Sequence, residues 1–300
     1  MEDSEANDLQ AGKDPEAGVT VEFSRTEPGE RLPVRLEDLR EQLPGLEPDR
    51  QVTDWGRSER LENVVDRTLY DFLYHLWFRV DVEGIENVPV QGGALLVANH
   101  SGIVPSDGVM VGKAVREEHP RSRSVHLSTD GSMAGIPGLG MLVTKLGAVA
   151  DHPANLHRLL YDERALVLTF PEGRHGARKP IRQRYLLRPF QDAAFVRVAM
   201  RAGVPIVPIA VLGAEEASPV FARIGPLRRL TRLPGLPLGP ALPLPAKFRI
   251  RFLEPVDTGE QGDQPWRDGR RVQSLGADIR ALIQENLLDM VGARRSVWLG

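Results

Sequence analysis

The sequence of 300 residues contains no cysteine, which excludes disulfide bonds and thiolate catalysis and fits a reducing compartment. No uninterrupted run of about 18 apolar residues occurs, so we expect no membrane-spanning helix. The first residues are acidic and lack the apolar centre of a signal peptide. The chain also lacks a Gly-x4-Gly-Lys-Ser/Thr phosphate loop and a Gly-x-Ser-x-Gly elbow, which argues against P-loop nucleotide hydrolysis and elbow-type serine hydrolysis.

Charge is unevenly divided along the chain. Residues 1–50 carry fourteen acidic and six basic side chains, a balance of −8, whereas the whole chain has a net charge of −3. Such a segment, rich in Glu, Asp, Gly and Pro, buries too little apolar surface to offset the entropy lost on ordering. We predict that residues 1–50 form an acidic, mostly disordered leader.

Residues 51–82 are expected to form an amphipathic helix that precedes the main domain. Seven apolar residues recur there at helical spacing: Leu61, Val64, Val65, Leu69, Phe72, Leu73 and Leu76. The second half is also rich in aromatic residues, which favour a membrane interface. Packing against a sheet explains the same pattern equally well, so both alternatives stay open.

Two apolar segments are each followed by side chains suited to catalysis. The segment 95–98 reads as a buried strand and ends at His100, with Asp107 one loop later. A histidine takes up a proton near neutral pH, and a carboxylate can orient it. The segment 166–169 repeats the pattern and displays Glu172 and Arg174 in a Pro/Gly turn.

Three blocks of residues together resemble one known family. Asn99-His100 with Asp107, the run Phe170-Pro171-Glu172-Gly173-Arg174, and the apolar run 204–209 have the order and intervals of the glycerolipid acyltransferases, the lysophosphatidate acyltransferase-like enzymes. The resemblance covers roughly residues 68–256. Its most specific element is the Phe-Pro-Glu-Gly run.

The resemblance implies an acyltransferase that moves a fatty acyl group from acyl-CoA, or from acyl carrier protein, to a glycerolipid hydroxyl. His100 would act as general base with Asp107 as its partner. The resemblance implies no metal and no cofactor other than this co-substrate. The implied substrate-binding residues are Asn99, Ser101, Phe170, Pro171, Glu172, Gly173 and Arg174.

The chain departs from the family pattern at two positions. Six residues separate His100 from Asp107 where the family usually has four, and His152 stands where the family commonly has a phosphate-binding arginine. The longer spacing leaves a non-catalytic lipid-binding scaffold of the same fold as an alternative. An acyl-CoA thioesterase, in which water replaces the alcohol, is a further alternative.

Basic residues gather in two places that we interpret as contacts with anions or an acidic membrane surface. Arg178 and Lys179 follow the Phe-Pro-Glu-Gly run, and Arg228, Arg229 and Arg232 lie in a stretch, residues 217–253, that contains seven prolines and no acidic residue. These basic residues are not interleaved with aromatic residues, so the pattern does not indicate nucleic acid binding. We therefore expect a cytoplasmic protein that associates peripherally with a membrane, with acyl-CoA and a glycerolipid as its partners.

Strands alternating with helices predict an α/β layered fold, and the resemblance implies the same. We expect residues 83–291 to form one domain with a mostly parallel or mixed central sheet between helices, followed by a tail at 292–300.

Overall fold

The computed structural model describes residues 21–22, 33–34, 52–101, 106–129, 138–177, 179–190, 193–220, 222–223, 237–238, 240, 242–259 and 264–298. The chain divides into two compact units, residues 1–51 and residues 52–300. In the first unit, β1 (Val21–Glu22) pairs antiparallel with β2 (Pro33–Val34). These four residues belong to the leader for which disorder is predicted, and its other residues, 1–20, 23–32 and 35–50, lie outside those described.

A seven-stranded sheet forms the centre of the second unit, in the order β3-β11-β8-β4-β7-β5-β6. Its strands are β3 (Asp81–Glu83), β4 (Ala94–Ala98), β5 (Val125–Thr129), β6 (Ala148–Ala150), β7 (Leu166–Thr169), β8 (Ile206–Leu212) and β11 (Arg249–Phe252). β8, β4, β7, β5 and β6 run parallel to one another. β11 pairs antiparallel with β8 and parallel with β3. A short pair, β9 (Ala222–Arg223) with β10 (Pro237–Leu238), lies outside this sheet.

The three central strands are buried over their whole length, which explains their continuous apolar sequences. The two prolines at 205 and 208 predict an edge or bulged strand. The edge alternative is wrong because β8 lies between β4 and β11. The pairing opposite Pro208 is bulged, because it passes from Ile209–Phe252 to Ile206–Val256 with one extra residue on the partner side. Pro208 is tolerated because it lies one residue beyond the last β8–β11 pair, Ile209 with Phe252, where its carbonyl accepts from Leu253 N–H.

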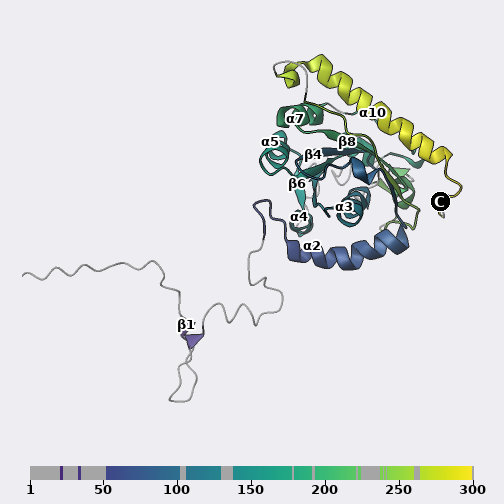
Figure 1. The fold of residues 1–300 in the computed structure, drawn as a ribbon. Coiled ribbons are helices and arrows are strands. Elements are labelled where there is room, and N and C mark those ends of the chain that lie inside the picture. The colour runs from purple at the N-terminus through teal and green to yellow at the C-terminus, as the bar shows by residue number, and fades with distance from the viewer. Residues whose placement is uncertain are drawn as a thin grey trace, which may run out of the picture. The chain divides into compact units, whose positions relative to one another are not determined.

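Helices cover both faces of the sheet (Figure 1). The longer elements are α2 (Glu59–Val65), η1 (Asp66–Tyr70), η2 (Phe72–Trp77), α3 (Ser106–Glu118), α4 (Leu139–Lys145), α5 (Pro153–His157), η4 (Arg158–Asp162), α6 (Gly173–Ala177), α7 (Ala194–Ala202), α8 (Ala214–Ala217) and α10 (Gly269–Gly292). Three short turns are η3 (Ile85–Asn87), η5 (Ile181–Gln183) and η6 (Pro265–Arg267).

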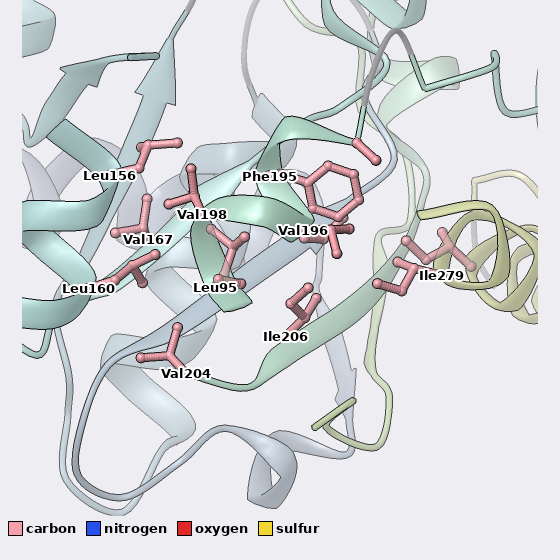
Figure 2. Close-up of a cluster of buried hydrophobic side chains, with 14 of the residues drawn as sticks. Leu95, Leu156, Leu160, Val167, Phe195, Val196, Val198, Val204, Ile206 and Ile279 are labelled. Atoms are coloured by element: carbon pink, nitrogen blue, oxygen red, sulfur yellow. The ribbon is translucent and has the colours of Figure 1, made fainter. Parts of the chain in front are cut away.

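Alternate residues of the central strands point into two hydrophobic clusters. On one face, Leu95 and Ile206 pack against α5, α7 and α10, as Figure 2 shows around Phe195 and Ile279. On the other face, Leu96 and its neighbours pack against α3 and the end of η2. The α/β fold with a mixed sheet between helices is therefore confirmed.

The helix expected over residues 51–82 is shorter: α2, η1 and η2 form a helical segment over residues 59–77, and β3 begins at Asp81. This segment packs on the second face of the sheet. Lys113 of α3 is buried and pairs with Asp66 at 3.1 Å and with Asp71 at 2.5 Å. The polar side of the segment therefore faces the domain at this point. A row of apolar side chains is 45% to 67% exposed: Val64, Leu69, Phe72 and Leu76.

No helix among the described residues is long and apolar enough to cross a membrane.

Candidate active site

The carboxyl ends of three neighbouring parallel strands, β8, β4 and β7, meet at one edge of the sheet. His100 follows β4, Glu172 follows β7, and Glu215 follows β8. Ligand sites in open α/β sheets lie typically at this edge, in the loops that leave the strands. The three side chains are therefore brought together by strand order, although they are far apart in the sequence.

His100 and Asp107 form the pair that the sequence predicts. His100 Nδ1 lies 2.8 Å from Asp107 Oδ2, and the Asp107 side chain is fully buried. Asp107 also accepts hydrogen bonds from the N–H groups of Ser101, at 2.9 Å, and Gly108, at 2.8 Å. The two residues meet across the longer loop because α3 begins at Ser106 and presents Asp107 in its first turn.

The second nitrogen of His100, Nε2, is not used by Asp107. Because a carboxylate only accepts, the bond to Asp107 places the proton of a neutral imidazole on Nδ1. Nε2 then has an open lone pair, and it has no hydrogen-bond partner in the described part of the chain. The side chain of His100 is 17% exposed, so this nitrogen lies in a site that is largely shielded from water.

Two neighbours pack closely against His100. The Phe170 ring stacks on His100 with centroids 4.5 Å apart and planes inclined by 28°. Gly176 of α6 packs so closely that an added Cβ would lie 3.1 Å from the His100 Cβ and 2.7 Å from the Glu172 Cβ. Phe170, expected to bind substrate, therefore contacts the imidazole of His100.

Asn99 and Ser101, expected to bind substrate, are both buried beside His100. The Asn99 amide donates to Val211 O at 2.9 Å and accepts from Val211 N–H at 2.8 Å, so it extends the pairing between β4 and β8. The Ser101 hydroxyl has no partner among the described residues. This geometry favours a structural role for Asn99 and leaves the hydroxyl of Ser101 as the candidate for a ligand contact.

The Phe-Pro-Glu-Gly run forms a tight turn that leads from β7 into α6. Gly173 N–H donates to Phe170 O at 2.9 Å, and Gly173 has a φ of 53°, a left-handed conformation that glycine adopts readily. Pro171 and Gly173 therefore shape the turn. Only the backbone of Arg174 is described, so its predicted contact with substrate stays a prediction.

Glu172 is expected from the sequence to contact the acceptor head group, but its carboxylate is fully buried. Its Oε1 accepts from His100 N–H at 3.0 Å, and its Oε2 accepts from Arg188 N–H at 2.6 Å. Both oxygens therefore bind the protein itself. The geometry favours a role in positioning the backbone of His100.

Lys179, predicted to contact an anion or a membrane, is buried instead. Its Nζ lies 3.3 Å from Glu172 Oε2 and 2.7 Å from Glu215 Oε1. The sequence analysis missed Glu215, although its place just after an apolar strand was a usable signal. The other predicted basic contacts, Arg178, Arg228, Arg229 and Arg232, lie outside the described residues.

One group of side chains in the described part of the chain has the spacing of a metal site. Ligand atoms of Asp71, His75 and Glu117 lie within 4.8 Å of one another. Lys113 already pairs with both carboxylates of this group, at 2.5 Å from Asp71 and 3.0 Å from Glu117. We therefore assign these residues to the attachment of the helical segment 59–77.

The surroundings of His100 raise the pKa of the imidazole above its ordinary value. Burial acts to lower it, but the charge and hydrogen bond of Asp107 and the charge of Glu172 act in the opposite direction and outweigh it. The charge of Lys179 lowers it in part. His100 therefore binds a proton readily and is suited to act as a base.

Comparison with known proteins shows the family. A family model described as Acyltransferase matches residues 79–212. Uncharacterized proteins of Mycobacterium tuberculosis and Mycobacterium leprae are each 35% identical, over 87% and 94% of this chain and 75% and 78% of their own lengths. The Gallus gallus protein named DGAT1/2-independent enzyme synthesizing storage lipids is 26% identical over 77% of this chain and 64% of its own.

The fold also matches a solved structure. The crystal structure of the 1-acyl-sn-glycerophosphate (LPA) acyltransferase PlsC from Thermotoga maritima superposes with a TM-score of 0.52 and 18% identity, over 78% of this chain and 81% of that one. The chain belongs to the glycerolipid acyltransferase family, and it is an acyltransferase of lipid metabolism.

We predict that kcat/KM for acyl transfer falls as pH decreases through a value above about 6.5, because His100 must be neutral to act as a base. This fall is the acidic limb of the pH profile. Asp107→Asn should move the acidic limb to lower pH, because the substitution removes the charge that favours the protonated imidazole. It should also lower kcat by roughly 10²- to 10⁴-fold. Asp289→Asn, a surface control paired with Arg251, should leave both unchanged. An unmoved limb in Asp107→Asn would contradict the pairing.

Proposed function

We propose that this acyltransferase moves a fatty acyl group from acyl-CoA to a hydroxyl of a glycerolipid, with His100 as general base. The observation that carries the proposal is the 2.8 Å bond between His100 Nδ1 and the buried Asp107, which leaves Nε2 open at the carboxyl end of β4. Membership of the acyltransferase family supports acyl transfer as the type of reaction.

In the proposed reaction, the acceptor oxygen attacks the thioester carbonyl while Nε2 of His100 removes its proton. Asp107 stabilises the resulting imidazolium through Nδ1–H. The tetrahedral intermediate then expels the CoA thiolate, which takes up a proton from His100. The products are an ester and CoA thiol, and no covalent enzyme intermediate is required.

For the acceptor we favour a lipid with a small or absent phosphate. The exposed His152, which stands in place of the family's arginine, already accepts from Ala154 N–H at 3.2 Å as the cap of α5. A histidine offers no bidentate phosphate contact. Arg174, at the start of α6, is our candidate for any remaining phosphate or head-group contact.

We predict that purified protein given radiolabelled acyl-CoA forms labelled ester only when a glycerolipid is present, and prefers mono- or diacylglycerol to lysophosphatidate. The measurement is chromatography of the labelled lipids together with release of CoA. CoA released at the same rate without acceptor would indicate a thioesterase. No turnover with any donor or acceptor would favour the scaffold, and either result would contradict the proposal.

We further propose that the exposed apolar row of the segment 59–77 docks on a membrane. Lys113 holds the polar side of the segment against α3, so Val64, Leu69, Phe72 and Leu76 point away from it. Exposed aliphatic and aromatic residues on one helix gain free energy on entering the lipid interface. Docking would bring a lipid acceptor close to the site.

The basic, proline-rich stretch, residues 217–253, lies beside the same region near its end. Trp77 Nε1 donates to Pro243 O at 3.0 Å, which ties the end of η2 to this stretch. β9 and β10 pair within the stretch, on either side of residues 224–236. Its arginines would then add electrostatic attraction to an anionic surface.

We predict that the double variant Leu69→Ser/Leu76→Ser binds phosphatidylglycerol vesicles at least tenfold more weakly at all salt concentrations. The reason is that each leucine side chain that moves from water into the lipid contributes about 1.5–3 kcal/mol to the binding free energy. Replacing Arg228, Arg229 and Arg232 with serine should weaken mainly the salt-sensitive part. Leu288→Ser is the matched control, a 48% exposed leucine on α10 at the opposite face of the sheet. Co-sedimentation unaffected by the first two changes would refute the docking surface.

A further inference from the structure

Lys179 is a buried cation directly behind the catalytic histidine. Its side chain is 2% exposed, and it bridges Glu172 and Glu215, which follow the strands on either side of β4. A buried ion pair of this kind is an uncertain source of stability, because desolvation offsets much of the attraction. Its position therefore calls for an explanation other than stability.

The structure connects Lys179 to His100 by a short route. Glu172, which Lys179 neutralises, accepts the hydrogen bond from His100 N–H at 3.0 Å. Lys179 and Ser101, the residue after His100, also line one small cavity of about 10 Å³, together with Glu215 and Ser218. This cavity has room for about one water molecule.

Few charged groups face His100. Asp107 approaches from α3, Glu172 from the end of β7, and Lys179 from beyond α6. α6 also carries His175, which is exposed, and Arg174, of which only the backbone is described. Residues 102–105, which lie outside the described part of the chain, contain no titratable side chain. Among the described groups that act on His100, two carboxylates are therefore opposed by one lysine.

We propose that Lys179 is a positioning residue of acyl transfer: its buried ammonium group pairs with Glu172, which in turn holds the backbone of His100. The inference rests on the proposed function and deepens it. Asp107 and Glu172 both favour the protonated imidazole, which cannot accept a proton from the acceptor. Lys179 opposes them and limits this effect.

The test is the pH profile of kcat/KM for acyl transfer in Lys179→Met. Loss of the charge should raise the pKa of His100 and move the acidic limb up by about one pH unit. Lys179→Arg keeps the charge and should keep the limb within a few tenths of a unit of wild type. Lys247→Met is the matched control, because Lys247 pairs with Asp81 at the sheet edge, and it should leave the limb unchanged.

Lys179→Met leaves two buried carboxylates without their cation and can fail to fold. The double variant Lys179→Met/Glu215→Gln removes one of these charges and leaves Glu172 with its two backbone N–H donors. It should show the same upward shift. An unchanged limb in the folded variant would overturn the inference.

Direct titration of the His100 ring by NMR separates this inference from the proposed function. If wild type transfers no acyl group, the proposed function fails, while an upward shift of the ring pKa in the variant still supports the charge balance. If wild type transfers and neither the limb nor the ring pKa moves, only the role of Lys179 is wrong.

Discussion

The buried carboxylate of Glu172 is the constraint on which the geometry of the site depends. It accepts from His100 N–H and Arg188 N–H and lies beside Lys179, so one side chain joins the ends of β4 and β7 to the segment after α6. A buried carboxylate needs such partners, because leaving it unpaired costs several kcal/mol. The backbone of His100 is thereby held, and Asp107 and Phe170 then orient the ring.

The sequence predicts the strands of the site well, because buried parallel strands have continuous apolar sequences. β4 and β7 were predicted close to their observed bounds. The central position of β8 was not predicted. A proline is disfavoured in a central strand only where its missing N–H group would have to donate a hydrogen bond to a neighbouring strand. At Pro208 the ladder with β11 has already ended. Local sequence does not contain this information, since the partner strand lies about forty residues further along the chain.

The roles of single site residues were harder to predict than their positions. The motifs place Asn99 and Glu172 next to His100, but each satisfies a backbone group from a distant segment, Val211 and Arg188. In the segment 59–77 the apolar spacing leaves both packing against the sheet and a membrane interface open, and the ion pairs of Lys113 fix which side faces the domain. Both outcomes depend on contacts between segments, which periodicity does not report.

The central claim is that Nε2 of His100 removes the proton from the acceptor hydroxyl. The most direct test is the rate of acyl transfer by His100→Gln at saturating acyl-CoA and acceptor, measured with thermal unfolding of the same protein. The account predicts a fall on the order of 10³-fold with an unchanged unfolding temperature. Transfer within tenfold of wild type by the folded variant would contradict it.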